Sequence, residues 1–114
     1  MSAITTHVLD TSIGRPASGV AVRLDRLATG GEWKPLGEGH TDADGRLRDL
    51  LPAEFEATPG EYRLTFDTGA YFQANHVGTF FPRAVIHFQL HEKGGHYHVP
   101  LLLSPFGYST YRGS

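Results

Sequence analysis

The strongest strand pattern in the chain spans residues 96–105, which read HYHVPLLLSP. Successive side chains of a strand point to opposite faces of a sheet, so Tyr97, Val99 and Leu101 share one face. His96 and His98 share the other face. The apolar face is expected to enter a protein core, and the segment therefore predicts a core strand whose outward face carries two imidazoles.

Similar alternation marks the rest of the chain as a series of short strands. Strands are predicted over residues 4–10, 20–27, 33–41, 46–48, 60–67, 85–90, 97–103 and 108–112. Gly and Asp residues predict turns at 29–31 and 42–45, and residues 92–95 are expected to form a hairpin loop. One helix is expected at residues 68–75, capped by Thr68. Eight short strands separated by turns predict an all-β fold, an antiparallel β-sandwich.

Length and composition limit the classes of function that the chain can have. The 114 residues are expected to form one domain, residues 1–114, without a linker or repeat. A net charge of −2 without a basic block argues against binding to nucleic acid or to an anionic membrane surface. The chain has no cysteine, which excludes disulfides and cysteine-ligated metals. No apolar run reaches membrane-spanning length and no signal segment is recognisable, so we expect a cytoplasmic protein.

Four groups carry candidate chemistry: His7, Arg46, His98 and the terminal residues 111–114. Both of these histidines fall on the polar side of a predicted strand, where a histidine is most often a solvated surface residue. His96 and His98 share a face, and with His7 as a third ligand they would suit zinc. Arg46 follows Asp-Gly and is equally typical of a surface turn, and the terminal residues are equally typical of an edge strand. The residues alone leave these alternatives open.

Four blocks carry a family resemblance: TTHVLD at 5–10, DADGR at 42–46, HYHVPLLLSP at 96–105 and YRGS at 111–114. In these blocks the chain resembles the transthyretin-related family of 5-hydroxyisourate hydrolases, and the resemblance covers essentially its whole length. It implies the transthyretin fold, with two four-stranded sheets and a short helix after the fifth strand. It also implies a homotetramer, a dimer of dimers with sites at subunit interfaces, and no cofactor or metal.

The resemblance also implies roles at the matching positions. The implied catalytic residues are His7, Arg46 and His98. The implied substrate-binding residues are Tyr111, Arg112, Gly113 and Ser114. The implied reaction is the opening of 5-hydroxyisourate by water at a ring amide carbonyl. A histidine that titrates near neutrality suits the general base of this reaction, and a fixed guanidinium suits the carbonyl oxygen that becomes negative.

Two other functions are compatible with a sandwich of this kind. A carrier of the transthyretin type would use the same channel for a hydrophobic, hormone-like ligand, and its channel should be lined by apolar and small residues. Two imidazoles and a guanidinium argue against the carrier. A structural module appended to other proteins is the third interpretation, and the absence of a linker disfavours it. We therefore expect a metal-independent hydrolase of urate degradation.

Overall fold

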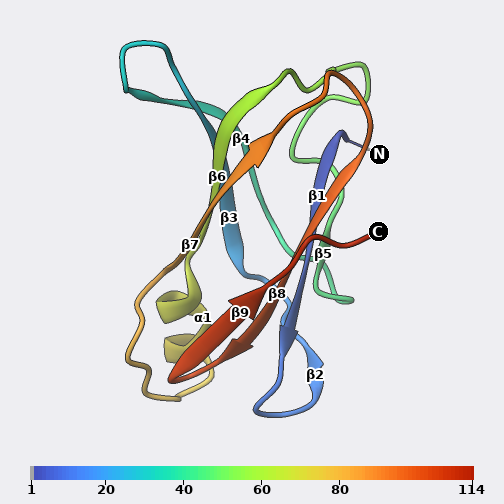
Figure 1. The fold of residues 1–114 in the computed structure, drawn as a ribbon. Coiled ribbons are helices and arrows are strands. Elements are labelled where there is room, and N and C mark those ends of the chain that lie inside the picture. Colours follow the sequence, from blue (N-terminus) through green and yellow to red (C-terminus); the bar gives the residue numbers. More distant parts are fainter. Residues whose placement is uncertain (1) are drawn as a thin grey trace.

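Two β-sheets pack face to face in the computed structural model, which describes residues 2–114 (Figure 1). The first sheet contains β1 (Ile4–Asp10), β2 (Arg15–Pro16), β5 (Arg46–Leu47), β8 (Tyr97–Ser104) and β9 (Gly107–Thr110). The second sheet contains β3 (Ala21–Leu27), β4 (Trp33–His40), β6 (Gly60–Phe66) and β7 (Ala84–Leu90). The helix α1 (Thr68–Ala74) lies between β6 and β7 in the chain. The predicted β-sandwich is confirmed.

The order of the strands refines this prediction. The first sheet has the order β2-β1-β8-β9, and the second has the order β4-β3-β6-β7. The second sheet has the expected four strands, whereas the first has five because the short β2 and β5 both pair with β1. The antiparallel prediction is wrong for one pair, since β1 and β8 run parallel. Parallel neighbours need a long crossover, and here the crossover contains the whole second sheet.

Residues 92–95 connect the two sheets and do not form the predicted hairpin loop. The strand before them, β7, pairs with β6 in the second sheet. The strand after them, β8, pairs with β1 and β9 in the first sheet. The composition of β7 and β8 suits a hairpin, but each strand pairs with other strands of its own sheet. The connection therefore delivers β8, which carries His98, to the middle of the first sheet.

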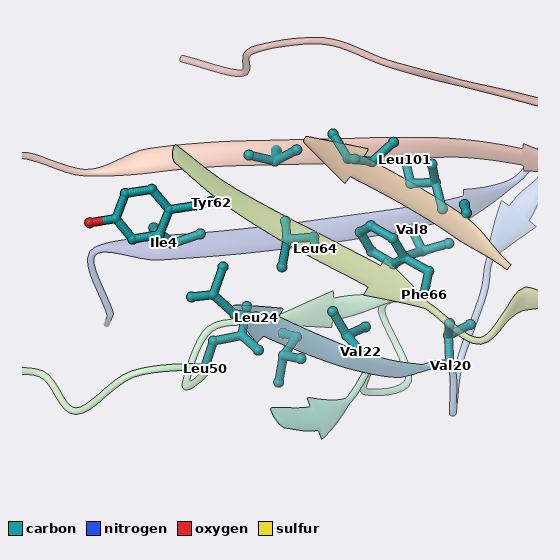
Figure 2. Packing of buried hydrophobic residues seen from close by; sticks show 14 of the residues in the cluster. Ile4, Val8, Val20, Val22, Leu24, Leu50, Tyr62, Leu64, Phe66 and Leu101 are labelled. Carbon is teal, nitrogen blue, oxygen red and sulfur yellow. The ribbon is translucent and has the colours of Figure 1, made fainter. Parts of the chain in front are cut away.

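The core lies between the sheets and takes its side chains from the inward faces of both (Figure 2). Ile4 and Val8 of β1 and Leu101 of β8 are fully buried, as the alternation predicts. They pack with fully buried residues of the second sheet, among them Leu24 and Leu64. Burying such a side chain contributes roughly 1.5–3 kcal/mol. The inward faces therefore fix the orientation of β1 and β8, and with it the outward position of His7 and His98.

The N-terminal cap of α1 is Asp67 and not the predicted Thr68. The Asp67 carboxylate accepts a hydrogen bond from the Ala70 amide at 3.3 Å. Thr68 is buried instead, and its hydroxyl donates to the Phe81 carbonyl at 3.2 Å. Both residue types are good caps, so the burial of Thr68 decides between them. In residues 2–114, no helix combines the length and the apolarity needed to cross a membrane.

Tyr71 connects α1 to the end of β1. Its hydroxyl donates a hydrogen bond to Asp10 Oδ2 at 2.8 Å. Burial, reinforced by this hydrogen bond, raises the pKa of Tyr71 to about 12. Asp10 is 3% exposed and also accepts a hydrogen bond from the Ser12 amide at 3.0 Å. Because a buried carboxylate needs such donors, the contact holds the helix against the first sheet.

The last strand ends earlier than the predicted range 108–112 because β9 ends at Thr110. The chain then continues along β8 in the antiparallel register of β9, up to a bridge between Gly113 and His98 (Figure 1). There the Gly113 amide donates a hydrogen bond to the His98 carbonyl at 2.8 Å. The final residues thus continue along the edge of the first sheet, beside β8.

Candidate active site

The outward face of the first sheet gathers polar residues from β1, β5 and β8. Thr5 of β1 lies beside His98 of β8, and His7 of β1 lies beside Arg46 of β5. Paired residues of neighbouring strands project from the same face, and residues two apart on one strand share a face. The fold therefore brings the predicted site residues His7, Arg46 and His98 onto one face, although they lie far apart in the sequence.

A tight turn positions Arg46. The Asp42 carboxylate accepts hydrogen bonds from the amides of Asp44 and Arg46, both at 2.9 Å. The bond from the Arg46 amide is the largest cause of a lowered pKa at Asp42. Gly45 has a φ of +75°, and a Cβ there would lie 2.3 Å from the Val8 carbonyl oxygen. Only glycine fits this position, so the predicted turn brings the backbone of Arg46 against β1.

His7 is attached to the same turn. Its Nε2 lies 2.8 Å from the carbonyl oxygen of Asp44, and a carbonyl oxygen only accepts hydrogen bonds. Nε2 therefore carries the hydrogen, and the free lone pair of the neutral ring is on Nδ1. This bond fixes the tautomer of His7 and orients its ring beside Arg46.

His98 is half-buried and is held by Thr5. Thr5 Oγ1 lies 2.9 Å from His98 Nδ1 and 3.1 Å from His96 Nε2. Burial lowers the pKa of His98 below its ordinary value of 6.5, and the positive charges of Arg46, His7 and His96 act in the same direction. The His98 imidazole is therefore neutral at neutral pH, with one ring nitrogen able to accept a proton.

The end of the chain lies beside His98. A Cβ on Gly113 would lie 2.7 Å from His98 Cδ2, so the tail backbone contacts the ring directly. Beyond this contact, Ser114 lines a hollow of about 210 Å³ together with Arg46, Arg48 and His98. Three predicted site residues thus share one hollow, which we call the small hollow.

Tyr111 and Arg112 face a different hollow. They line a groove of about 450 Å³ next to the edge strand β7, and His98 also contributes to it. The Arg112 guanidinium lies 5.1 Å from the centre of the Tyr97 ring, within the range of a cation–π contact. Within a single subunit, Tyr111 and Arg112 therefore lie outside the small hollow. The tail passes between the groove and the small hollow at His98.

Four residues that the motifs do not assign to the site also line the small hollow: Thr5, Thr6, Arg48 and His96. Alternation contains a signal for two of them, since Thr5 precedes His7 by two residues and Arg48 follows Arg46 by two. His96 enters the sequence argument only as a possible zinc ligand. Within residues 2–114, no three side chains of His, Cys, Asp or Glu converge in the way that a metal ion requires.

Comparison with known proteins shows which family the chain belongs to. A profile of the HIUase/Transthyretin family matches residues 4–113. The chain belongs to this family. A 5-hydroxyisourate hydrolase of Salmonella dublin is 50% identical over 111 residues, which are 97% of this chain and 80% of that protein. The resemblance carried by the sequence motifs is confirmed.

Solved structures of the HIUase/Transthyretin family have the same fold. The structure of Klebsiella pneumoniae 5-hydroxyisourate hydrolase is 41% identical, covers 100% of both chains and gives a TM-score of 0.85. Sea bream transthyretin in complex with thyroxine is 34% identical and gives a TM-score of 0.89, over 97% of this chain and 94% of that chain. An enzyme and a hormone-binding protein therefore superpose about equally well, so only the side chains of the site separate the two functions.

Proposed function

We propose that this chain is a 5-hydroxyisourate hydrolase of urate degradation, which converts 5-hydroxyisourate and water to 2-oxo-4-hydroxy-4-carboxy-5-ureidoimidazoline. The observation that carries the proposal is the gathering of His98, Arg46 and Ser114 around one hollow, with His7 beside Arg46. Family members named 5-hydroxyisourate hydrolase, 50% and 41% identical to this chain, support it.

In the proposed reaction, the oxygen of water bonds to a ring amide carbonyl carbon and the bond from that carbon to nitrogen breaks. His98 accepts the proton of the attacking water, because its lowered pKa keeps the ring neutral. The proton then passes to the departing nitrogen, and His98 returns to its neutral state. Arg46 stabilises the carbonyl oxygen as it becomes negative, because the turn fixes its backbone and its cationic side chain lines the small hollow.

His7 has a different role in this proposal. Its bond to the Asp44 carbonyl leaves Nδ1 as the acceptor of the neutral ring. We assign it the orientation of substrate or water beside Arg46, and we assign the base to His98 because His98 lines the small hollow.

The tail is proposed to bind the substrate through Tyr111, Arg112, Gly113 and Ser114. Ser114 contributes a hydroxyl inside the small hollow. The Tyr111 ring is 56% exposed in one chain and offers an aromatic surface for a planar heterocycle. Gly113 is suited to its place because any side chain there would meet the His98 ring.

The proposal includes a homotetramer, a dimer of dimers with sites at the subunit interfaces. The small hollow, at about 210 Å³, is below the roughly 300 Å³ at which ligand pockets usually start. A second copy placed over the outward face of the first sheet would enlarge the hollow and exclude water from it. Light scattering of the active protein tests this assembly, and full activity in a monomer would contradict it.

A hormone carrier is the weaker interpretation, although the fold superposes on a transthyretin with bound thyroxine. A site for an apolar ligand is lined mainly by hydrophobic side chains. Here the small hollow is lined by Arg46, Arg48, His96 and His98, which are polar or charged. These side chains suit a polar substrate whose charge changes during reaction.

The ultraviolet decay of freshly generated 5-hydroxyisourate, with and without the protein, tests the proposed function. We expect the protein to accelerate the decay, and an unchanged decay would exclude the activity. His98→Ala and His7→Ala should each lower turnover by about two orders of magnitude, as removal of a positioned acid–base group does. The matched control is His40→Ala, since His40 is exposed at the end of β4 in the second sheet. Near-native turnover in either site variant would remove its assigned role.

Metal independence and a cytoplasmic location belong to the same proposal. The proposed chemistry uses water, imidazole and guanidinium, so exhaustive chelation should leave the rate unchanged. A rate that is lost on chelation and restored by zinc would overturn the mechanism. Fractionation of the producing cells tests the location.

A further inference from the structure

Thr5 lies between two histidines that the motifs place on one strand. Its Oγ1 is 2.9 Å from His98 Nδ1 and 3.1 Å from His96 Nε2. Thr5 is 3% exposed, and it makes no other side-chain hydrogen bond within residues 2–114. A hydroxyl has one proton and accepts through its lone pairs, so Thr5 donates to only one of the two rings at a time.

This single proton couples the two imidazoles. When Thr5 donates to His96 Nε2, His98 Nδ1 has to carry its own hydrogen and donate it to Thr5. The Nε2 lone pair of a neutral His98 is then free to accept a proton. When His96 Nε2 carries a hydrogen and donates it to Thr5, the Thr5 proton turns to His98 Nδ1. A neutral His98 then carries its hydrogen on Nε2, where it donates and cannot act as a base.

We propose that Thr5 and His96 are positioning residues, which determine whether Nε2 of His98 accepts or donates a hydrogen bond. A neutral His96 with a bare Nε2 gives the base form of His98, and a protonated His96 gives the donor form. The consequence for hydrolysis rests on the proposed function, whereas the coupling between the rings is a property of the fold alone.

The charges around His98 make its tautomer relevant. An imidazolium has a hydrogen on both nitrogens, so only a neutral ring has a tautomer to select. The groups that face His98 are His7 on β1, Arg46 on β5 and His96 just before β8, and each disfavours a positive charge on the His98 ring. Arg48 lines the same hollow and adds to the positive surroundings. The small hollow therefore keeps His98 in the state on which Thr5 and His96 act.

Nitrogen NMR of protein labelled with ¹⁵N-histidine tests the coupling without an activity assay, because protonated and bare ring nitrogens resonate far apart. In the unmodified protein, the His98 nitrogen shifts should change as His96 titrates. Thr5→Val keeps the branched shape but lacks the hydroxyl, so the His98 shifts should no longer follow His96. Thr5→Ser restores the hydroxyl and should restore the coupling. Thr65→Val on β6 of the second sheet is the matched control and should leave both titrations unchanged.

His96→Phe tests the direction of the effect. With no acceptor at position 96, the Thr5 proton has only His98 Nδ1 to bond, so neutral His98 should carry its hydrogen on Nε2. Turnover of 5-hydroxyisourate should then fall by about tenfold or more in kcat with little change in KM, because base strength and not binding is lost. Thr5→Val should also lower kcat, and Thr5→Ser should recover it.

Two outcomes would overturn the proposal. His98 shifts that are identical in Thr5→Val and in the unmodified protein would show that the rings are not coupled. Altered shifts with unchanged kcat in both Thr5→Val and His96→Phe would show that the tautomer does not control hydrolysis. Absence of hydrolysis by the unmodified protein is a separate result, which would refute the proposed function and leave the NMR coupling standing.

Discussion

The contact between Gly113 and His98 yields the sharpest prediction, for Gly113→Ala. A Cβ at position 113 would lie 2.7 Å from His98 Cδ2 and 3.3 Å from both Cβ and Cγ of the same residue. Real Cβ atoms essentially never approach a neighbour within 3.0 Å, so the ring or the tail has to move. The ring is held by Thr5 at 2.9 Å, and the tail is held by the bond from the Gly113 amide to the His98 carbonyl at 2.8 Å.

The size of the displacement sets the expected loss. Ordinary van der Waals contact begins at 3.4 Å, so the 2.7 Å approach has to open by 3.4 − 2.7, or about 0.7 Å. A misplacement of about 1 Å in a catalytic group costs on the order of 100-fold in rate. We therefore expect kcat of Gly113→Ala to fall by about tenfold to 100-fold, which corresponds to roughly 1.4–2.7 kcal/mol in the barrier. Thermal stability should change little, because the tail lies outside the core.

The assay compares kcat and the thermal midpoint of Gly113→Ala with those of Gly78→Ala. At Gly78 an added Cβ has no atom within 4 Å, so this control should keep both values. A Gly113→Ala variant with full turnover would show that the ring contact has no role in catalysis. A large drop in its thermal midpoint would show that the tail supports the fold, and the argument from ring position would then fail.

Three further predictions follow from the same structure. Arg46→Lys keeps the charge but loses the planar guanidinium, so turnover should fall at least tenfold with an unchanged thermal midpoint; normal kinetics would make Arg46 a turn residue only. Because the pKa of His98 is lowered, the base should stay neutral until the pH falls below about 6.5, and the acid limb of the kcat/KM profile should lie below that pH. A limb above pH 6.5 would exclude His98 as the base. Tyr71→Phe removes a donor from the buried Asp10 carboxylate, so urea unfolding should show a loss of about 1.5–3 kcal/mol with normal kcat; unchanged stability would show that another donor replaces the tyrosine.

Prediction from the sequence worked best where the relevant forces are local. Alternation placed Ile4 and Val8 in the core and His7 on the opposite face, because the side-chain period of a strand is two. The sequence DADG predicted the turn before Arg46, because Asp and Gly accept its backbone angles. The helix was found, but its cap was misassigned, since burial of Thr68 against the Phe81 carbonyl depends on the tertiary fold.

Prediction failed where strand partners are distant in the sequence. Residues 92–95 have the composition of a hairpin loop, yet β8 pairs in parallel with β1, which lies almost the whole chain away. The same parallel register sets Thr5 beside His98, so the bridge from Thr5 to both histidines could not be predicted from either strand alone. The tail was expected to act as one block, but its path beside β8 places Ser114 in the small hollow and Tyr111 in the groove beside β7.

The sequence by itself determined the inward and outward faces of the strands, the turn that carries Arg46 and the motifs that identify the HIUase/Transthyretin family. These properties depend on the chemistry of neighbouring residues, which the sequence states directly. The tertiary structure alone decided which outward residues meet, which nitrogen of His7 carries the hydrogen and how the tail packs beside His98. Those properties depend on strand pairing and close packing, in which hydrogen-bond partners and steric contacts come from segments far apart along the chain.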